Sequence, residues 1–241
     1  MRVAFLSDVH ANLPALCRAL ESARRNGAEA LFCAGDLVGG GPHPTEVVRL
    51  LMEREIPCIL GNVDRKVLSL GRDSKRLRRR IREGRGAAAA WAALSLGEAE
   101  RAWLSSRPAE LRLALGAADA WIVHGSPLSD EDYLYPSLTP RALGPRLGGE
   151  RPDLLVCGHT HIPFARAVGA VRVVNCGSVG RPIDGDPRGS YALCDFGGGG
   201  RVQSRIVRFT YPVEALVADL ESRGVPKGHP AFYRTGRAHA V

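Results

Sequence analysis

The stretch MRVAFLSDVHANL at residues 1–13 places an apolar run directly before an aspartate and a histidine. Arg2 to Ser7 has the composition of a short buried strand, and Asp8 and His10 follow its end. Residues two apart in an extended segment project from the same side of the chain, because side chains alternate faces. The stretch therefore predicts a strand that presents a carboxylate and an imidazole together to a small positive ligand.

The same order of short strand, polar turn and helix recurs along the chain. After the first strand we expect helices at about 13–25 and 44–54, and strands at 30–34, 57–60, 118–123 and 154–157. These strands end in the polar sequences GD, GN, HG and GHTH. The alternation predicts an α/β fold.

The pattern changes after residue 163, where strands follow one another across short glycine-containing turns. We expect antiparallel strands at 164–168, 171–175, 191–196 and 202–209. A closing helix is predicted at 212–221, and the tail that completes the C-terminal segment at about 212–241 has no clear pattern.

The chain has 241 residues, enough to bury one large core, and no linker divides it, so we expect one domain over residues 1–241. The apolar run Val3 to Leu6 is too short for a membrane span or a secretory leader, so we expect a cytoplasmic protein without a membrane partner. Six cysteines stand without a CxxC pair. They predict buried thiols in a reducing compartment rather than disulfides or a zinc site.

Much of the net charge of +8 comes from RDSKRLRRRIREGRG at residues 72–86, which has few acids to balance its cations. The first interpretation is a solvated helix face or a mobile segment. The alternative is a phosphate-rich ligand or a nucleic acid, although no aromatic residue is interleaved to stack on bases. With helices expected just after it, the stretch belongs to a basic helical insertion at about 66–108.

Seven polar side chains follow apolar runs at the expected strand ends: Asp8, His10, Asp36, Asn62, His124, His159 and His161. Ligand sites of α/β sheets assemble at the carboxyl ends of strands. A single histidine there is more typical of a structural residue, but burying seven polar groups together without a cation would be costly. Three oxygen donors and four imidazoles suit two divalent cations about 3.5–4 Å apart that share a carboxylate. Manganese is favoured, and iron, zinc, nickel or cobalt fit the same donors.

The ordered segments SDVHANL, CAGDLVGGGPHP, LGNVD, VHGSP and CGHTHIP resemble the calcineurin-like metallophosphoesterase superfamily. GDLVGGGPHPTEV and NCGSVGRPIDGDPRGSYAL are similar to segments of its small bacterial and archaeal phosphodiesterases, and the resemblance runs from Met1 to about Phe196. It implies an α/β (α+β) four-layer sandwich, the metallo-dependent phosphatase fold, in which two mixed β-sheets are flanked by helices.

By position, the resemblance implies that Asp8, His10, Asp36 and His161 hold one metal, and that Asp36, Asn62, His124 and His159 hold the second. Asp36 would bridge the two, and a hydroxide between them would attack phosphorus in line. We therefore expect Asp36, Asn62 and His124 to be the catalytic residues of a phosphoesterase. Its substrate would be a small phosphorylated molecule or a nucleotide, and a phosphodiester is favoured.

Val63 departs from the family pattern, because many members have a histidine directly after the asparagine. That histidine stabilises the transferring phosphoryl group or protonates the leaving oxygen, and a positioned acid typically contributes about 10²- to 10⁴-fold. Substrates with good leaving groups should suffer least from its absence. Asp64 would orient such a histidine, or it caps the following helix. An aromatic ring that the subgroup often carries near Gly40 is also absent.

Three further residues are candidates for substrate binding. His43 lies in the GGGPHP loop and could reach the substrate, although a histidine beside two prolines is more often simply exposed. Arg181 and Arg188 could bind phosphate oxygens bidentately, or could instead pair with Asp184 or Asp186.

Two other functions stay open. A relative of the retromer scaffold subunit would share the fold and act as an interaction surface, but eroded ligands would mark it, and none of the seven is eroded. A nuclease or nucleic-acid-binding protein would use Arg72 to Arg85, and its binding would depend steeply on salt. We rank the di-metal phosphoesterase first, the scaffold second and the nucleic-acid partner third.

Overall fold

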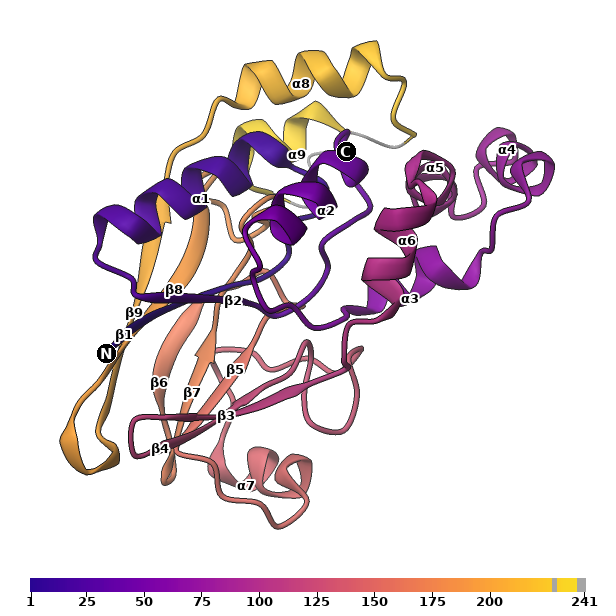
Figure 1. The fold of residues 1–241 in the computed structure, drawn as a ribbon. Helices are drawn as coiled ribbons and strands as arrows, with labels where there is room; N and C mark the ends of the chain where they lie inside the picture. Colours follow the sequence, from indigo (N-terminus) through magenta and orange to yellow (C-terminus); the bar gives the residue numbers. More distant parts are fainter. Residues whose placement is uncertain (227–228, 238–241) are drawn as a thin grey trace.

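Two β-sheets packed face to face form the centre of the computed structural model, which describes residues 1–226 and 229–237 (Figure 1). The first sheet has the order β2 (Ala30–Cys33), β1 (Arg2–Leu6), β8 (Gly189–Phe196) and β9 (Val202–Phe209). The second has the order β3 (Leu111–Leu115), β4 (Ala118–Ile122), β5 (Leu154–Cys157), β7 (Val171–Asn175) and β6 (Phe164–Val168). Both sheets are mixed, since β1 and β2 are parallel, as are β4, β5 and β7, whereas the remaining neighbours are antiparallel.

The alternation of side chains along β1 supplies two different cores. Val3 and Phe5 point between the sheets, where they join Ile122 and Val156 of the second sheet. Ala4 and Leu6 point to the opposite face and pack in the cluster that includes the helices. A strand buried on both faces reads as a continuous apolar run, which is why RVAFL was recognisable in the sequence.

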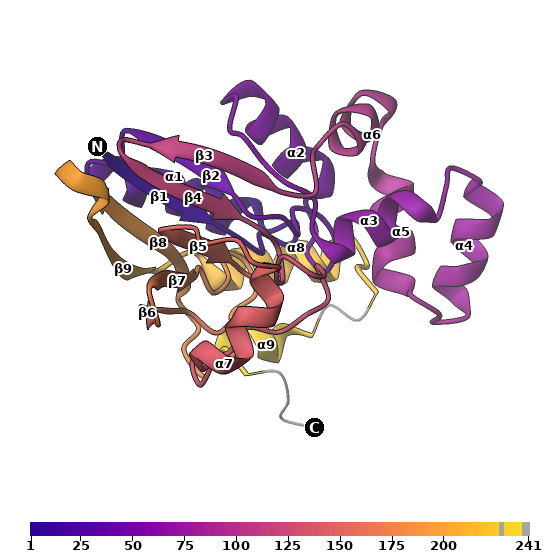
Figure 2. The same ribbon diagram turned by 90° about the horizontal axis from the view of Figure 1, so that it is seen from below.

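Helices cover both outer faces of the sandwich. The first sheet is covered by α1 (Leu13–Arg25), α2 (Pro44–Glu53), α8 (Val213–Ser222) and α9 (Pro230–Thr235) (Figure 1). The second sheet is covered by the short helix α7 (Pro140–Leu143) and the 3-10 turn η1 (Gly144–Leu147), whose leucines pack on β5 and β7 (Figure 2). This four-layer arrangement confirms the predicted fold class.

Four consecutive helices form an insertion at one side of the sandwich: α3 (Asn62–Ser69), α4 (Ser74–Arg82), α5 (Ala87–Ser95) and α6 (Glu98–Ser105) (Figures 1 and 2). The basic stretch forms α4, which packs on α5 and buries Leu77. Most of its arginines are exposed, as a solvated helix face requires.

Two predictions about elements were wrong, and one strand was missed. Residues 57–60 form no strand, because Cys58 makes only an isolated bridge to Cys33 before Leu60 N turns to donate to Pro108 O. The strand β3 was not predicted. The tail was expected to lack a pattern, but it contains α9, whose Tyr233 is buried; residues 227–228 and 238–241 of that tail lie outside the described residues.

The thiols agree with the sequence prediction in most respects. All six cysteines are free and five are buried, whereas Cys17 on α1 is exposed. Among the described residues, no helix has the length and apolar character needed to cross a membrane.

Candidate metal centre

The predicted ligands meet at one edge of the sandwich, where parallel strands of both sheets end. Asp8 and His10 follow β1 and Asp36 follows β2, whereas His124 follows β4 and His159 and His161 follow β5. Asn62 is the first residue of α3. The structure therefore brings all seven side chains to the place where the carboxyl ends of the two pairs of parallel strands converge.

The backbone at these residues is held in an unusual conformation. Among the described residues, seven that are not glycine have a positive φ, and five of them are Asp8, His10, Asp36, His159 and His161, at 48° to 61°. A left-handed conformation is unfavourable for a residue with a side chain, and it persists where the surrounding structure enforces it, often at functional sites. Four of these five residues, all except His159, contribute donor atoms to a group that could hold a metal ion.

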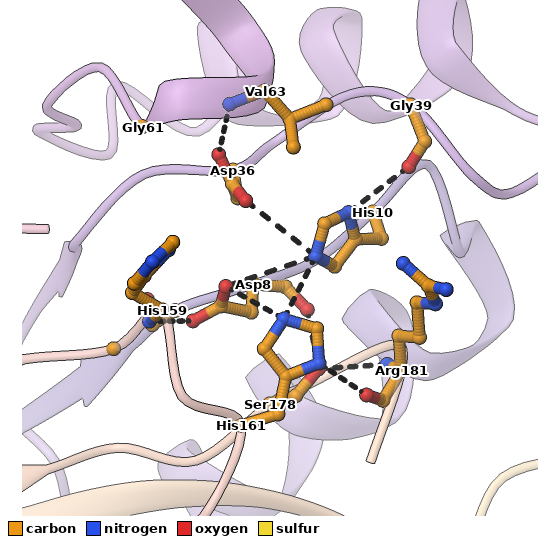
Figure 3. Close-up of polar contacts among 12 residues, drawn as sticks. Asp8, His10, Asp36, Gly39, Gly61, Val63, His159, His161, Ser178 and Arg181 are labelled. Carbon is orange, nitrogen blue, oxygen red and sulfur yellow. Dashed lines mark hydrogen bonds and ion pairs between the residues drawn. The ribbon is translucent and has the colours of Figure 1, made fainter. Parts of the chain in front are cut away.

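The donor atoms form two overlapping groups, Asp8–His10–His161 and Asp8–Asp36–His124, within each of which they lie no more than 4.8 Å apart. Nε2 of His161 lies 3.1 Å from Asp8 Oδ1, and Nε2 of His10 lies 3.6 Å from Asp36 Oδ2 (Figure 3). Nε2 of His124 lies 3.4 Å from Asp36 Oδ2 and 3.1 Å from Asn62 Oδ1. Asp8 is thus common to both groups and Asp36 also lies between them, so the bridging role of Asp36 stays a prediction.

Hydrogen bonds to the backbone fix the tautomer of three of the histidines. Nδ1 of His10 donates to Gly39 O at 3.0 Å, Nδ1 of His124 to Ala34 O at 2.7 Å and Nδ1 of His161 to Arg181 O at 2.6 Å. A carbonyl oxygen only accepts, so Nδ1 of each ring carries a proton, and Nε2 faces the centre and offers a lone pair there whenever the ring is neutral. This is the usual arrangement around a metal-binding histidine.

As a result, the Nε2 atoms of two neutral histidines face each other and a carboxylate. Nε2 of His10 lies 3.0 Å from Nε2 of His161, and both face the Asp8 carboxylate. Asp8 Oδ1 and His159 Nε2 are buried without a hydrogen-bond partner. Such a concentration of buried acceptors is stable only with positive charge among them, which a proton or a metal ion can supply. The imidazole and carboxylate donors therefore fit divalent metal ions.

The charges of the residues agree with this arrangement. Burial alone would raise the pKa of Asp8 and of Asp36, but the neighbouring histidines outweigh it and hold both pKa values below their usual range. Burial lowers the pKa of His10 and of His159, which favours the neutral, metal-binding ring. Burial also opposes protonation of His124, but Asp36 outweighs it and raises the pKa of His124 to about 10, so that without metal a proton supplies the missing charge.

Two glycines allow the backbone to pass against the carboxylates. A Cβ on Gly61 would collide with Asp36, and a Cβ on Gly158 would collide with Ser7 and Asp8. Because neither position has room for a methyl group, the GN and GH dipeptides of the sequence have a steric as well as a chemical reason.

Several positioning residues were not recognised in the sequence. Ser178 Oγ donates to Asp8 O at 2.7 Å and Asn175 Nδ2 donates to Gly158 O at 2.7 Å. Both lie in NCGSVG, where polar residues directly after a buried strand were the available signal.

Asp64 was expected to orient a histidine or cap a helix. It is buried and accepts hydrogen bonds from the N–H groups of Gly61, Leu37 and Val38. Burial and the nearby Asp36 raise the pKa of Asp64 to about 7.

A hollow of about 190 Å³ opens beside His10, lined by Val63, the first turn of α5, Lys66 and Arg181. Val63 donates its N–H to Asp36 Oδ1 at 2.8 Å and presents an apolar side chain where the family pattern has an imidazole (Figure 3). Arg181 thus stands next to the centre. A second hollow of about 240 Å³ lies beside His124.

The other two predicted substrate residues are directed elsewhere. His43 was expected to be exposed or to reach the substrate, but it is buried and its Nε2 bonds Asp219 Oδ2 of α8 at 3.1 Å. Arg188 pairs with Asp186 at 2.7 Å and lines a surface hollow together with Arg18 and Arg208, apart from the ligands. The pairing alternative was therefore correct for Arg188.

Comparison with known proteins identifies the relatives of this arrangement. The family model of the calcineurin-like phosphoesterase superfamily domain matches residues 1–199. The structure of a metallophosphoesterase from Sphaerobacter thermophilus is 27% identical, with a TM-score of 0.78 over 98% of this chain and 99% of that one. The protein PH1004 of Pyrococcus horikoshii OT3 has the same fold, with a TM-score of 0.85, 21% identity and coverage of 98% and 99% of the two chains.

A relative with a named activity is also found. Phosphodiesterase YfcE of Escherichia coli K12 is 29% identical over 205 residues, which are 81% of this chain and 88% of that protein. The family match includes all seven predicted ligands and every strand of the two sheets except β9. The chain belongs to the calcineurin-like phosphoesterase superfamily and is a hydrolase of phosphoester bonds.

Proposed function

We propose that this protein is a two-metal phosphodiesterase whose substrates, nucleotide-type diesters among them, have good leaving groups. The observation that carries the proposal is that the Nε2 atoms of His10, His124 and His161 all face the carboxylates of Asp8 and Asp36. Asp36 Oδ2 lies 3.6 Å from His10 Nε2 and 3.4 Å from His124 Nε2, so a carboxylate stands between the two groups, as a pair of neighbouring divalent ions would require.

Two bound divalent ions would lower the pKa of a water molecule to near neutral and withdraw charge from a phosphoryl oxygen. Asp8, His10, Asp36 and His161 would hold one ion, and Asp36, Asn62, His124 and His159 the other. Arg181 and Lys66, at the hollow beside His10, place positive charge where the outer oxygens of a phosphodiester could bind. Val63 offers no proton to the leaving oxygen, so the leaving group must be stable as an anion.

The test is a comparison of p-nitrophenyl phosphate with bis-p-nitrophenyl phosphate on metal-stripped protein to which Mn²⁺, Zn²⁺, Mg²⁺ or Ni²⁺ is added. We expect turnover that requires metal, favours the diester and falls by at least about 10²-fold in Asp36→Asn and in His124→Ala. Asp186→Asn is the matched control, because it also removes a carboxylate but lies at the Arg188 pair, and its activity should equal that of the wild type. Equal rates in Asp36→Asn and wild type would refute the proposal.

The scaffold alternative receives no support from the site, since five of the seven predicted ligands form two groups that could each hold a metal ion. The nucleic-acid alternative is favoured by one observation, the exposed arginines of α4. Binding of a single-stranded oligonucleotide whose affinity falls steeply with salt, and is lost when Arg76, Arg79 and Arg82 are replaced by Gln, would support it.

A further inference from the structure

The loop between β4 and α7 gathers exposed apolar side chains beside the metal centre. In the described part of the chain, the large apolar residues that are exposed are Met1, Leu128, Tyr133 and Tyr135. The last three lie at residues 123–139, which we name the β4–α7 loop, and they are 66%, 51% and 44% exposed. Because exposed apolar side chains are otherwise rare on this protein, their concentration in one loop indicates a binding surface.

The two tyrosines are connected to the predicted ligands. The ring of Tyr133 lies 4.5 Å from the ring of His159, with 39° between their planes. The ring of Tyr135 lies 5.7 Å from that of Tyr133 and is nearly parallel to it, with 4° between the planes. A row of three rings therefore begins at the metal centre and ends in solvent.

The rest of the loop keeps this row in place. Leu134, between the two tyrosines, is buried in the core on the outer face of the second sheet. Asp132 forms a two-pronged ion pair with Arg146, at 2.6 and 3.0 Å. Leu138 N donates to Tyr135 O at 2.9 Å. Because these contacts order the backbone that carries the tyrosines, a ligand that stacks on the rings has little chain to immobilise.

The size and the position of this surface limit what can bind it. A stable protein partner needs about 800 Å² on each side, far more than three side chains offer. A ring that begins to stack beside His159 must instead be part of a molecule whose phosphoryl group is at the centre. Arg181 and Lys66, next to His10, favour an anionic molecule. A nucleotide combines a phosphoryl group with a planar ring one sugar away, and bases stack on tyrosine regardless of sequence.

We propose that Tyr133 and Tyr135 form a stacking platform for the nucleobase of a nucleotide-type phosphodiester, an inference that rests on the proposed function. Tyr135, which does not contact a predicted ligand in this row, selects for the base. Tyr133 also packs on His159, so it has a structural role as well.

Two chromogenic diesters with the same leaving group test the proposal: p-nitrophenyl thymidine 5′-phosphate and methyl p-nitrophenyl phosphate. The wild-type protein, loaded with Mn²⁺, should have a lower KM for the thymidine diester. In Tyr135→Leu we expect that KM to rise about 5- to 150-fold, the range for loss of one base–aromatic stack. Its kcat and KM for the methyl diester should be unchanged, and Tyr135→Phe, which keeps the ring, should behave as wild type.

A binding measurement separates this proposal from the proposed function. Saturation-transfer NMR on metal-free protein with thymidine 5′-monophosphate should show contact with the thymine protons, and the signal should be lost in Tyr135→Leu but kept in Tyr135→Phe. If neither diester is hydrolysed, the proposed function fails and this signal alone decides the platform. If both diesters are hydrolysed with the same ratio of kcat/KM in wild type and Tyr135→Leu, or if the wild type gives no thymine signal, the platform is wrong.

Discussion

At the scale of the residue, the centre depends on hydrogen bonds that orient three of its histidines. Gly39, Ala34 and Arg181 each use a backbone carbonyl to hold the Nδ1 proton of one histidine. The inner surface of the site consequently consists of carboxylate oxygens and imidazole Nε2 atoms, which are acceptors when the rings are neutral. Their preference for a cation comes from the surrounding backbone rather than from the ligands alone.

Gly158→Ala should weaken metal binding without removing a ligand. The new methyl group would occupy the space of Ser7 and Asp8, so the Asp8 carboxylate must move. We expect the affinity for Mn²⁺ to fall about 10- to 100-fold, the usual cost of disturbing a residue that orients a ligand. Isothermal titration calorimetry measures it, with Gly144→Ala as the control, because a Cβ at Gly144 meets open space. An unchanged affinity would show that Asp8 has room to adjust.

Val63→His should broaden the range of leaving groups. Its side chain would face the hollow beside His10, where it could donate a proton to a leaving oxygen. We expect kcat/KM for a phenyl phosphodiester to rise by up to about 10²-fold, and that for the p-nitrophenyl diester to change little, because a weaker base needs less protonation. Val63→Ala enlarges the hollow without an imidazole. A similar gain in Val63→Ala would attribute the effect to space instead.

At the scale of the element, two polar contacts join α2 and α8. His43, the residue that precedes α2, bonds Asp219 of α8, and Arg223 bonds Glu46 of α2 at 2.7 Å. These contacts hold α8 against α2 and the loop that follows Asp36. His43 therefore stabilises the packing of the two helices.

His43→Gln should alter stability and leave catalysis unchanged. Burial, followed by the charge of Arg223, lowers the pKa of His43 in the folded protein. The unfolded chain therefore binds the proton more readily, and the free energy of unfolding should decrease as the pH falls below about 6.5. In His43→Gln this part of the pH dependence should disappear, as urea titrations at pH 5 and 8 would show, whereas His229→Gln should retain it. If kcat/KM falls by more than about twofold in His43→Gln, His43 contributes to substrate binding after all, as the sequence allowed.

Some elements could be predicted from the sequence and others could not, depending on how far they are buried. Strand β5 is buried and apolar throughout, and β7 is mostly so apart from Arg172 and Asn175, so their composition reveals them. The edge strand β3 alternates leucine with arginine and alanine and is partly exposed, which makes its signal weak. Residues 57–60 have the composition of a strand but lack a partner beyond Cys33, and a partner is a tertiary property. For the same reason the seven ligands could be predicted from their strand ends, whereas Ser178, Asn175 and Tyr133 depend on contacts across the sandwich.

At the scale of the whole molecule, the predicted ligands connect the two sheets. Asp8, His10 and Asp36 come from the first sheet, and His124, His159 and His161 from the second. An ion bound by both sets would therefore act as a cross-link between the layers as well as a cofactor.

Metal binding should raise the unfolding temperature. At a free Mn²⁺ concentration of 100 times Kd, one site adds about 2.7 kcal/mol, which corresponds to about 5–10 °C for a chain of this size. Differential scanning calorimetry with Mn²⁺ and with EDTA measures the shift, and Asp36→Asn should reduce it strongly. A wild-type Tm that is the same in both conditions would indicate that the ions do not join the sheets.

The exposure of a single cysteine gives the molecule a practical property. A maleimide dye should react with Cys17 on α1, because the other five thiols are shielded in the core. Cys17 belongs to the helical layer over the first sheet, and the tryptophans Trp91 and Trp103 belong to the insertion. Energy transfer from these two indoles to a dye on Cys17 would report movement of the insertion without any engineered labelling site, once Trp121 of β4 is replaced by Phe.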